Sequence, residues 1–282
     1  MELTVRPATV ADREAVLAIS RQIWEGHDYV QQFFDRWILD GGMLVGEIRG
    51  RVIGFGKMTE LAPGELWLEG LRVDPGKGGR GLGRELSHRI LYAALARRPR
   101  SLRLATADVN HASLAIIRDT AFRHVLTYKY LTGAPPVADA GPGLVHPSPA
   151  EAFDFLRSSD EQRLGHGLVP YVWLFREANL HHVAELCRKR WVYGVRHCGR
   201  LAGLLIVRPH RYSPADLDIS FVSGSKPALA EFRALVGRVG AKRGSRSVTG
   251  MCAGTGMAGA LAGFGLKPVT GFKDVLVYEY PI

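Results

Sequence analysis

The chain has 282 residues, of which 46% are hydrophobic and 23% charged, as is ordinary for a folded globular protein. This length predicts two domains, each with a core of its own. No apolar run reaches the roughly 20 residues of a membrane span, and the first residues, MELTVRPATVADRE, lack the apolar segment of a signal peptide. We therefore expect a cytoplasmic protein with no membrane partner.

The cysteines and the net charge narrow the class further. Cys187, Cys198 and Cys252 are far apart and odd in number, so we expect reduced thiols, with neither a disulfide framework nor a metal site. The net charge is +10, but no basic run is longer than Arg188-Lys189-Arg190. We interpret this charge as a solvated basic surface or an attraction for an anionic ligand, and not as a nucleic-acid site.

Residues 1–131 read as alternating strands and helices in the order β-α-α-β-β-β-α-β-α-β. Thr9 or Asp12 can cap the first helix, and Arg49-Gly50-Arg51 is a hairpin turn between two strands. The predicted strands are residues 3–5, 43–48, 52–59, 66–73, 102–107 and 125–131, and the predicted helices are residues 10–24, 29–39, 82–96 and 111–121.

A glycine-rich turn comes after the strand that ends at Val73. Pro75 has no N–H to donate, so the strand stops there. The turn Gly78-Gly79-Arg80-Gly81-Leu82-Gly83 then leads into the next helix. Glycines allow close approach of the backbone, and the free N–H groups at a helix start carry partial positive charge. The sequence therefore predicts a phosphate site.

Two nucleotide motifs explain this turn poorly. A P-loop needs Gly-Lys followed by Ser or Thr, but Gly78 comes after Gly76-Lys77. A dinucleotide fingerprint, Gly76-x-Gly78-x-x-Gly81, needs an acid about 20 residues later, and the next strand ends only at Asp108. The antiparallel strands before the turn also differ from the βαβ units of a dinucleotide domain.

The turn resembles the pyrophosphate loop of the GNAT superfamily of acyl-CoA-dependent N-acyltransferases, R/Q-x-x-G-x-G/A. Gly81 and Gly83 fill the glycine positions, while Gly78 stands where the family has Arg or Gln. Lys77, Arg80 or Arg84 can supply the missing charge. The element order is also that of the family, so the resemblance implies an α/β (α+β) fold with a mixed central sheet flanked by helices.

The same resemblance implies how acetyl-CoA is held. Pantetheine would lie between the strands that end at Val73 and start at Leu102, and Asn110-x-x-Ser113 is similar to the family motif whose Asn binds the pantetheine arm. Asn110 is equally readable as a helix cap. The expected acyl-CoA contacts are Leu71, Arg72, Val73, Gly78, Gly79, Arg80, Gly81, Leu82, Gly83, Arg84, Asn110 and Ser113.

The second half repeats the first. Gly50-Arg51-Val52-Ile53-Gly54 recurs as Gly199-Arg200-Leu201-Ala202-Gly203, whereas Val222–Ala228 stands in place of the glycine-rich turn. We expect two tandem GNAT-like domains: residues 1–132 with the acyl-CoA loop, a linker at 133–143 rich in Pro, Gly and Ala, and a degenerate copy at 144–282. Residues 254–259 also match a dinucleotide fingerprint, with Glu279 beyond, but too few residues remain after them for a Rossmann half.

Glu69 is the candidate general base. It lies among apolar neighbours on the strand that would carry pantetheine, where a carboxylate can have a raised pKa. It is also readable as a salt-bridged or substrate-anchoring residue. The Tyr that the family often uses to protonate the leaving thiolate is replaced by Ile117, so water, Tyr128 or Tyr130 would have to serve.

Short blocks of the first 85 residues resemble histidine N-acetyltransferase-like proteins, among them residues 23–29 and 68–73. This implies a small-molecule primary amine as acceptor, such as a free amino acid. The turn between the first two helices borders the acceptor site in this fold, so Glu25, His27, Asp28 and Tyr29 are candidate substrate residues. An acyl-CoA sensor without turnover stays an alternative, and an NAD(P)-binding protein a distant third.

Overall fold

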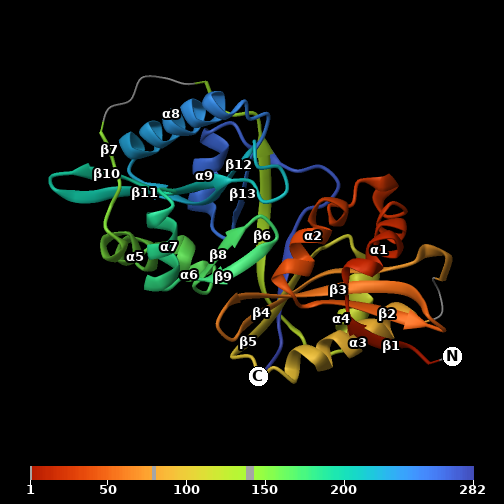
Figure 1. The fold of residues 1–282 in the computed structure, drawn as a ribbon. Helices are drawn as coiled ribbons and strands as arrows, with labels where there is room; N and C mark the ends of the chain where they lie inside the picture. The colour runs from red at the N-terminus through yellow and green to blue at the C-terminus, as the bar shows by residue number, and fades with distance from the viewer. Residues whose placement is uncertain (1, 78–80, 138–142) are drawn as a thin grey trace. The chain divides into compact units, whose positions relative to one another are not determined.

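A computed structural model gives the structure of the protein over residues 2–77, 81–137 and 143–282 (Figure 1). Two compact units make up the chain. Unit 1 consists of Met1–Thr106, Asn110–Val125 and Val277–Ile282, and unit 2 of Ala107–Val109 and Leu126–Leu276. The units are therefore not contiguous segments. The predicted domains 1–132 and 144–282 stay predictions, and part of the predicted linker, residues 138–142, lies outside the described residues.

Unit 1 is built on a mixed sheet with the strand order β1-β2-β3-β4-β5-β15. β4 and β5 are parallel, and β1 to β4 pair antiparallel. The elements are β1 (Thr4–Pro7), α1 (Arg13–Ser20), α2 (Val30–Asp40), β2 (Met43–Ile48), β3 (Arg51–Ala62), β4 (Glu65–Val73), α3 (Leu82–Leu95), β5 (Ser101–Ala107), α4 (His111–Arg118) and the start of β6 (Arg123–Gly133). The predicted element order is confirmed.

Both faces of this sheet are covered by helices (Figure 1). Neighbouring residues of a strand point to opposite faces, so Leu44 packs in the cluster that contains Leu86 of α3. Val45, one residue on, packs with Phe34 of α2. This alternation gives unit 1 two cores, one on each side of the sheet, and makes it the flanked mixed sheet that the sequence predicts.

The helix predicted over residues 10–24 is interrupted. Val10–Asp12 forms a 3₁₀ turn, and α1 begins only at Arg13. The Asp12 carboxylate accepts hydrogen bonds from the Arg6 guanidinium at 2.7 and 2.8 Å and from the Thr9 N–H at 2.8 Å. The Arg6 guanidinium holds the pKa of Asp12 at about 2. These polar contacts fix the chain at Asp12, which apolar spacing does not reveal.

Unit 2 is also a sheet between helices, with the strand order β6-β13-β12-β11-β10-β7 and a parallel β12–β13 pair. Leu217, Ile219 and Val248 pack with α8 and α9, and Leu204, Ile206 and Phe221 pack with α5 and α7. No helix of the described residues is long and apolar enough to cross a membrane. The elements are β7 (Leu144–Val145), α5 (Pro149–Arg157), α6 (Asp160–Leu164), β8 (Leu168–Tyr171), β9 (Leu174–Glu177), α7 (Leu180–Arg188), β10 (Val192–His197), β11 (Arg200–Pro209), β12 (Leu217–Gly224), α8 (Lys226–Arg243), β13 (Val248–Cys252), α9 (Thr255–Gly263) and β14 (Lys267–Pro268). The last strand, β15 (Val275–Glu279), begins in unit 2 and ends in unit 1.

The two units repeat one hairpin in detail. Arg49 and Gly50 have φ angles of 51° and 74°, and Cys198 and Gly199 have φ angles of 49° and 79°. Two successive left-handed residues are the requirement of a type I′ turn, which matches the twist of antiparallel strands. A strained turn at equivalent places in both units supports the interpretation of the second half as a copy of the first.

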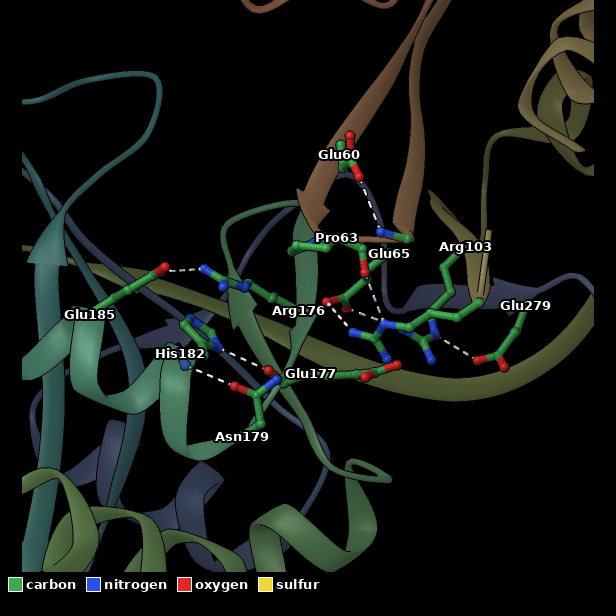
Figure 2. A network of polar contacts seen from close by, with 12 residues as sticks. Glu60, Pro63, Glu65, Arg103, Arg176, Glu177, Asn179, His182, Glu185 and Glu279 are labelled. Atoms are coloured by element: carbon green, nitrogen blue, oxygen red, sulfur yellow. Dashed lines mark hydrogen bonds and ion pairs between the residues drawn. The ribbon is translucent and has the colours of Figure 1, made fainter. Parts of the chain in front are cut away.

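The last residues of the chain complete unit 1. The Tyr280 N–H donates to the carbonyl of Leu102 at 2.9 Å. Arg103 donates to Glu279 at 2.6 Å and to the buried Glu65 at 3.2 Å (Figure 2). Val277 is fully buried. Unit 1 therefore obtains its outer strand from a segment more than 170 residues away in the sequence.

Removal of residues 277–282 should destabilise unit 1. Val277 alone contributes about 2 kcal/mol by burial, and the charges of Arg103 and Glu65 would lose a neighbour. We expect a lower midpoint of thermal unfolding than in a control that lacks only the exposed residues 281 and 282. Equal midpoints for the two truncated chains would show that the returning strand does not stabilise unit 1.

Candidate functional site

The centre of the site is a β-bulge in β4. Phe55 pairs with Arg72 and Lys57 with Glu69, so Gly70 and Leu71 together face the single residue Gly56. Gly70 is left-handed, with φ 67°, and a Cβ there would lie 2.4 Å from Cη2 of Trp37. Only glycine satisfies both the backbone and the packing at this point.

β4 separates from β5 at the bulge. The parallel pairing runs from Glu65–Ser101 to Leu68–Leu104 and ends there, although β4 continues to Val73. Residues 69–73 therefore leave the ladder on the β5 side. Of the predicted pantetheine contacts, Leu71 and Val73 are half-buried on this segment, and the Leu71 carbonyl accepts from Arg72 Nη1 at 2.9 Å. The pairing of β4 with β5 thus ends where the pantetheine site is predicted.

The connection from β4 to α3 leads to a helix start at which no side-chain cap is present among the described residues. Pro75–Lys77 forms a 3₁₀ turn. Gly78, Gly79 and Arg80, three of the predicted phosphate contacts, lie outside the described residues. Gly81 is the N-cap of α3, with φ 73°, and no side chain makes a cap hydrogen bond to it among the described residues. The first N–H groups of α3 are therefore suited to an anion.

The remaining predicted contacts lie at the start of α3 and α4. Leu82 and Gly83 form the first turn of α3, and Arg84 pairs with Asp119 at 2.7 Å. Asn110 is the N-cap of α4, where its Oδ1 accepts from the Ser113 N–H at 3.2 Å. The capping role is thus observed for Asn110, and its amide group stays a predicted pantetheine donor.

Glu69 is half-buried on the separated segment of β4. Its Oε1 accepts a hydrogen bond from Thr59 Oγ1 at 2.6 Å. Thr59, on β3, had no signal in the sequence beyond its place in a strand. A hydroxyl donor orients the carboxylate and leaves it able to accept a further proton, which suits both a general base and an ammonium anchor.

Ile117 and the two candidate tyrosines have structural roles. Ile117 is buried in the core that contains Leu86. Tyr128 and Tyr130 lie in β6 within unit 2, and burial raises the pKa of both above its ordinary value. Tyr130 also lines a cavity of about 260 Å³ in unit 2. A phenol with a raised pKa is a weaker acid, so neither tyrosine is specially activated to donate a proton.

The predicted acceptor residues lie in a strained turn between α1 and α2. Trp24 and Glu25 have φ angles of 47° and 56°, which bulky residues adopt only under constraint. Glu25 and His27 are exposed and Tyr29 is half-buried. The turn thus presents a carboxylate, an imidazole and, at Trp24, an indole that is 57% exposed.

Asp28 faces inward. Its side chain is fully buried, and its two oxygens accept from Arg72 at 3.0 and 3.2 Å. Ser20 Oγ donates to Oδ2 at 2.9 Å. The structure therefore gives Asp28 a partner other than the predicted amino group. Arg72 is 44 residues away in the sequence, and nothing in the local pattern points to this pair.

Unit 2 lacks a phosphate cradle among its described residues. Eight residues, 74–81, connect β4 to α3, whereas Ser225 alone connects β12 to α8. Ser225 Oγ accepts from the Ala228 N–H, and Pro227 removes another donor. A Cβ at Gly203 would lie 2.7 Å from the Cβ of Ala228. The start of α8 therefore packs directly on β11, with its serine cap in place.

The second glycine motif of unit 2 is occupied by the chain itself. The Glu161 carboxylate accepts from the N–H groups of Ala253 and Gly254 at 2.6 and 2.8 Å. It lies where a phosphate would bind at the start of α9. The dinucleotide interpretation of residues 254–259 therefore has no free anion site among these residues.

The buried histidine of unit 2 is structural. His182 Nδ1 contacts the Glu177 carbonyl at 3.0 Å, and the backbone N–H of His182 donates to Oδ1 of the cap residue Asn179 (Figure 2). Burial lowers the pKa of His182 to about 4, so the ring is neutral. The neighbouring Arg176 pairs with Glu185 at 2.6 Å. These contacts hold α7 and β9 together.

Comparison with known proteins agrees with this geometry. Residues 13–122 match the model of the acetyltransferase (GNAT) family. A GCN5-related N-acetyltransferase from Sphaerobacter thermophilus is 13% identical, with a TM-score of 0.68 over 98% of this chain and 95% of its own. A putative acetyltransferase from Thermoplasma acidophilum is 18% identical, with a TM-score of 0.61 over 99% of this chain and 100% of its own.

A third similar structure is that of a tandem protein. A tandem GNAT protein from the clavulanic acid biosynthesis pathway is 16% identical, with a TM-score of 0.58 over 99% of this chain and 98% of its own. None of the curated proteins matches the chain. Residues 13–122 therefore match the acetyltransferase (GNAT) family, and the whole chain shares its fold with solved acetyltransferase structures, a tandem GNAT protein among them.

Proposed function

We propose that the protein is an acetyl-CoA-dependent N-acetyltransferase that acts on the primary amine of a small molecule, such as a free amino acid, histidine among the candidates. The observation that carries this is in unit 1. There β4 leaves its ladder with β5 and, through an eight-residue connection, leads to a helix start that has no side-chain cap among the described residues. These are the two parts that hold pantetheine and pyrophosphate.

Each part of the site has its own task in this reaction. Main-chain groups of residues 71–73 hold pantetheine, and the first N–H groups of α3 bind the pyrophosphate. Glu69 accepts the proton of the ammonium group, directly or through a water. The amine nitrogen then attacks the thioester carbonyl, a C–N bond forms, and the C–S bond breaks. Acetyl-CoA supplies the activated acyl group, and with Ile117 in the core the leaving thiolate takes its proton from water.

A sensor that binds acyl-CoA without turnover is the second candidate. Ile117, at the position where the family often has Tyr, is 6% exposed in the core and has no acidic group. The glycine at position 78 removes a charge from the loop. An NAD(P)-binding function has less support, because Glu161 fills the anion position of residues 254–259.

A carboxylate at the start of α3 should weaken acetyl-CoA binding. A Cβ at Gly83 would meet Val73 and Ile116 at 3.6 and 3.7 Å, so a side chain fits there without a clash. Gly83→Asp should raise the Kd for acetyl-CoA at least tenfold, about 1.4 kcal/mol. Gly256→Asp is the matched control, because Gly256 is the second residue of α9 and a Cβ there meets open space. Equal calorimetric affinities in the two variants would contradict the proposed cradle.

One acetyl-CoA should bind per chain. The helix starts of unit 2 are satisfied by Ser225 and Glu161, so unit 2 offers no comparable phosphate site among its described residues. Isothermal titration calorimetry with acetyl-CoA should give a stoichiometry near one. Two equivalent sites would require unit 2 to bind the cofactor in a way that its closed α8 connection does not provide.

Replacement of Glu69 should separate the two roles left open for it. Glu69→Gln keeps the Thr59 contact and removes basicity, so kcat should fall by about 10²–10⁴-fold while acetyl-CoA affinity holds. The loss should shrink at high pH, where the amine is already deprotonated. Glu60→Gln, in an exposed residue at the end of β3, is the control. An increase in acceptor KM alone would identify Glu69 as an anchor and leave the base to another group.

A further inference from the structure

The turn between α1 and α2 contains three successive left-handed residues. Trp24, Glu25 and Gly26 have φ angles of 47°, 56° and 86°. Glycine adopts this conformation freely, whereas a bulky aromatic residue and a glutamate do so only where their surroundings determine it. Strain of this kind gathers at ligand-binding segments, so the contacts that maintain it are informative.

Arg72 maintains the turn. Its guanidinium lies 4.3 Å from the centroid of the Trp24 ring and 5.6 Å from that of Tyr29. It is also paired through two hydrogen bonds with Asp28. The Arg72 side chain is 12% exposed and that of Asp28 is 0% exposed, so solvent screens the pair little. One guanidinium thus contacts the beginning and the end of the turn.

Arg72 also belongs to the strand that carries the proposed cofactor site. It lies two residues beyond Gly70, where β4 has left β5. Its Nη1 donates to the Leu71 carbonyl. The acceptor turn is therefore attached directly to the segment of β4 that would hold pantetheine, and the indole of Trp24 lies beside that segment.

Trp24 is the exposed aromatic residue of the turn that Arg72 holds. Arg72 covers part of the indole, yet 57% of the residue remains exposed. A tryptophan that is strained, fixed in place and exposed is suited to packing against a ligand. Within residues 24–29, all of which the structure describes, Asp28 is neutralised by Arg72. Glu25 is the exposed carboxylate beside the ring.

We propose that Trp24 determines acceptor specificity by packing against a flat, ring-containing side chain of the amine. In this arrangement Arg72 and Asp28 are positioning residues that hold the indole in place. The proposal rests on the proposed N-acetyltransferase function and narrows it to primary amines that carry an aromatic or heteroaromatic group. Asp28 then acts through the turn, and Glu25 and His27 are left to contact polar groups of the acceptor.

The test compares ring-containing and small acceptors on the full-length chain. Histidine and phenylalanine are assayed against alanine by release of free CoA. The wild-type chain should favour the ring-containing amino acids by at least tenfold in kcat/KM. Trp24→Ala should reduce this preference to less than threefold, mainly through KM, and Trp24→Phe should retain it. The Kd for acetyl-CoA should be unchanged in both variants.

A separate measurement tests the positioning role of Arg72 and Asp28. Asp28→Asn should raise KM for histidine or phenylalanine at least tenfold, while kcat changes less than threefold and acetyl-CoA binds as before. A general loss of folding would instead lower kcat and acetyl-CoA affinity together. Should Asp28→Asn fail to fold, the comparison of Trp24→Ala with Trp24→Phe still decides the proposal.

The outcomes separate the role of Trp24 from the acetyltransferase activity. If the wild-type chain turns over and prefers ring-containing acceptors, but Trp24→Ala leaves this preference unchanged, the role of Trp24 is overturned. The proposed acetyltransferase activity then stands. Turnover with no preference for rings also overturns the role of Trp24. Where no amino acid is acetylated, calorimetry of phenylalanine and histidine binding to the chain with CoA replaces kinetics. Ring-selective binding that Trp24→Ala abolishes supports the role of Trp24 without catalysis, and absence of any binding overturns both proposals.

Discussion

The proposed function depends on one break in a hydrogen-bond ladder. β4 and β5 pair as far as Leu68 and Leu104, and the bulge at Gly70 turns β4 away beyond that point. The bulge is held from the face of the sheet that α2 covers, because the Trp37 ring of α2 occupies the space where a side chain of residue 70 would lie. Gly70 therefore determines three features together: the point where β4 leaves β5, the packing of α2 on the sheet, and the direction of the Arg72 side chain.

The second unit shows that a bulge alone does not make a cofactor site. In β12, Ser220 is the extra residue between Phe221 and Ile219, which pair with Ile206 and Val207. Ser220 donates to the buried Asp218 at 2.7 Å and accepts from Arg208 at 2.8 Å. The units differ in the connection between this strand and the next helix, which has eight residues in unit 1 and a single capping residue in unit 2.

This difference suggests why the second unit persists without a cradle. The segment that completes the sheet of unit 1, Val277–Ile282, comes directly after unit 2 in the chain. A copy without a phosphate cradle among its described residues can thus be retained, because the chain must pass through it to reach this segment. Its buried Arg208–Asp218 pair adds little net stability against an apolar pair of similar size, but removal of one partner would leave an unpaired charge in the core.

The sequence predicts the features that periodicity and glycines encode. The order of elements, the hairpin at Gly50, the glycine at the start of α3 and the shortened connection in the copy all come from local patterns. It does not predict contacts between distant segments. No local pattern indicates that Asp28 pairs with Arg72, or that the Tyr280 N–H donates to the carbonyl of Leu102. The helix predicted over residues 10–24 begins late for a local reason that apolar spacing does not show, since Arg6 and Thr9 hold the Asp12 carboxylate.

The magnitudes show why the acceptor turn needs its ion pair. Two strained residues, Trp24 and Glu25, together cost about 2–6 kcal/mol. A partly desolvated cation on an aromatic ring returns about 1–2 kcal/mol, which alone does not offset that strain. Loss of one partner of a buried ion pair costs about 3–5 kcal/mol. Removal of Arg72 would thus take away the contact with the Trp24 ring and leave the buried Asp28 charge unpaired, while the strain of the turn remains. Its conformation then depends on Arg72, which depends on the path of β4 after Gly70. The shape of the proposed acceptor surface is therefore set by the same bulge at which β4 leaves β5.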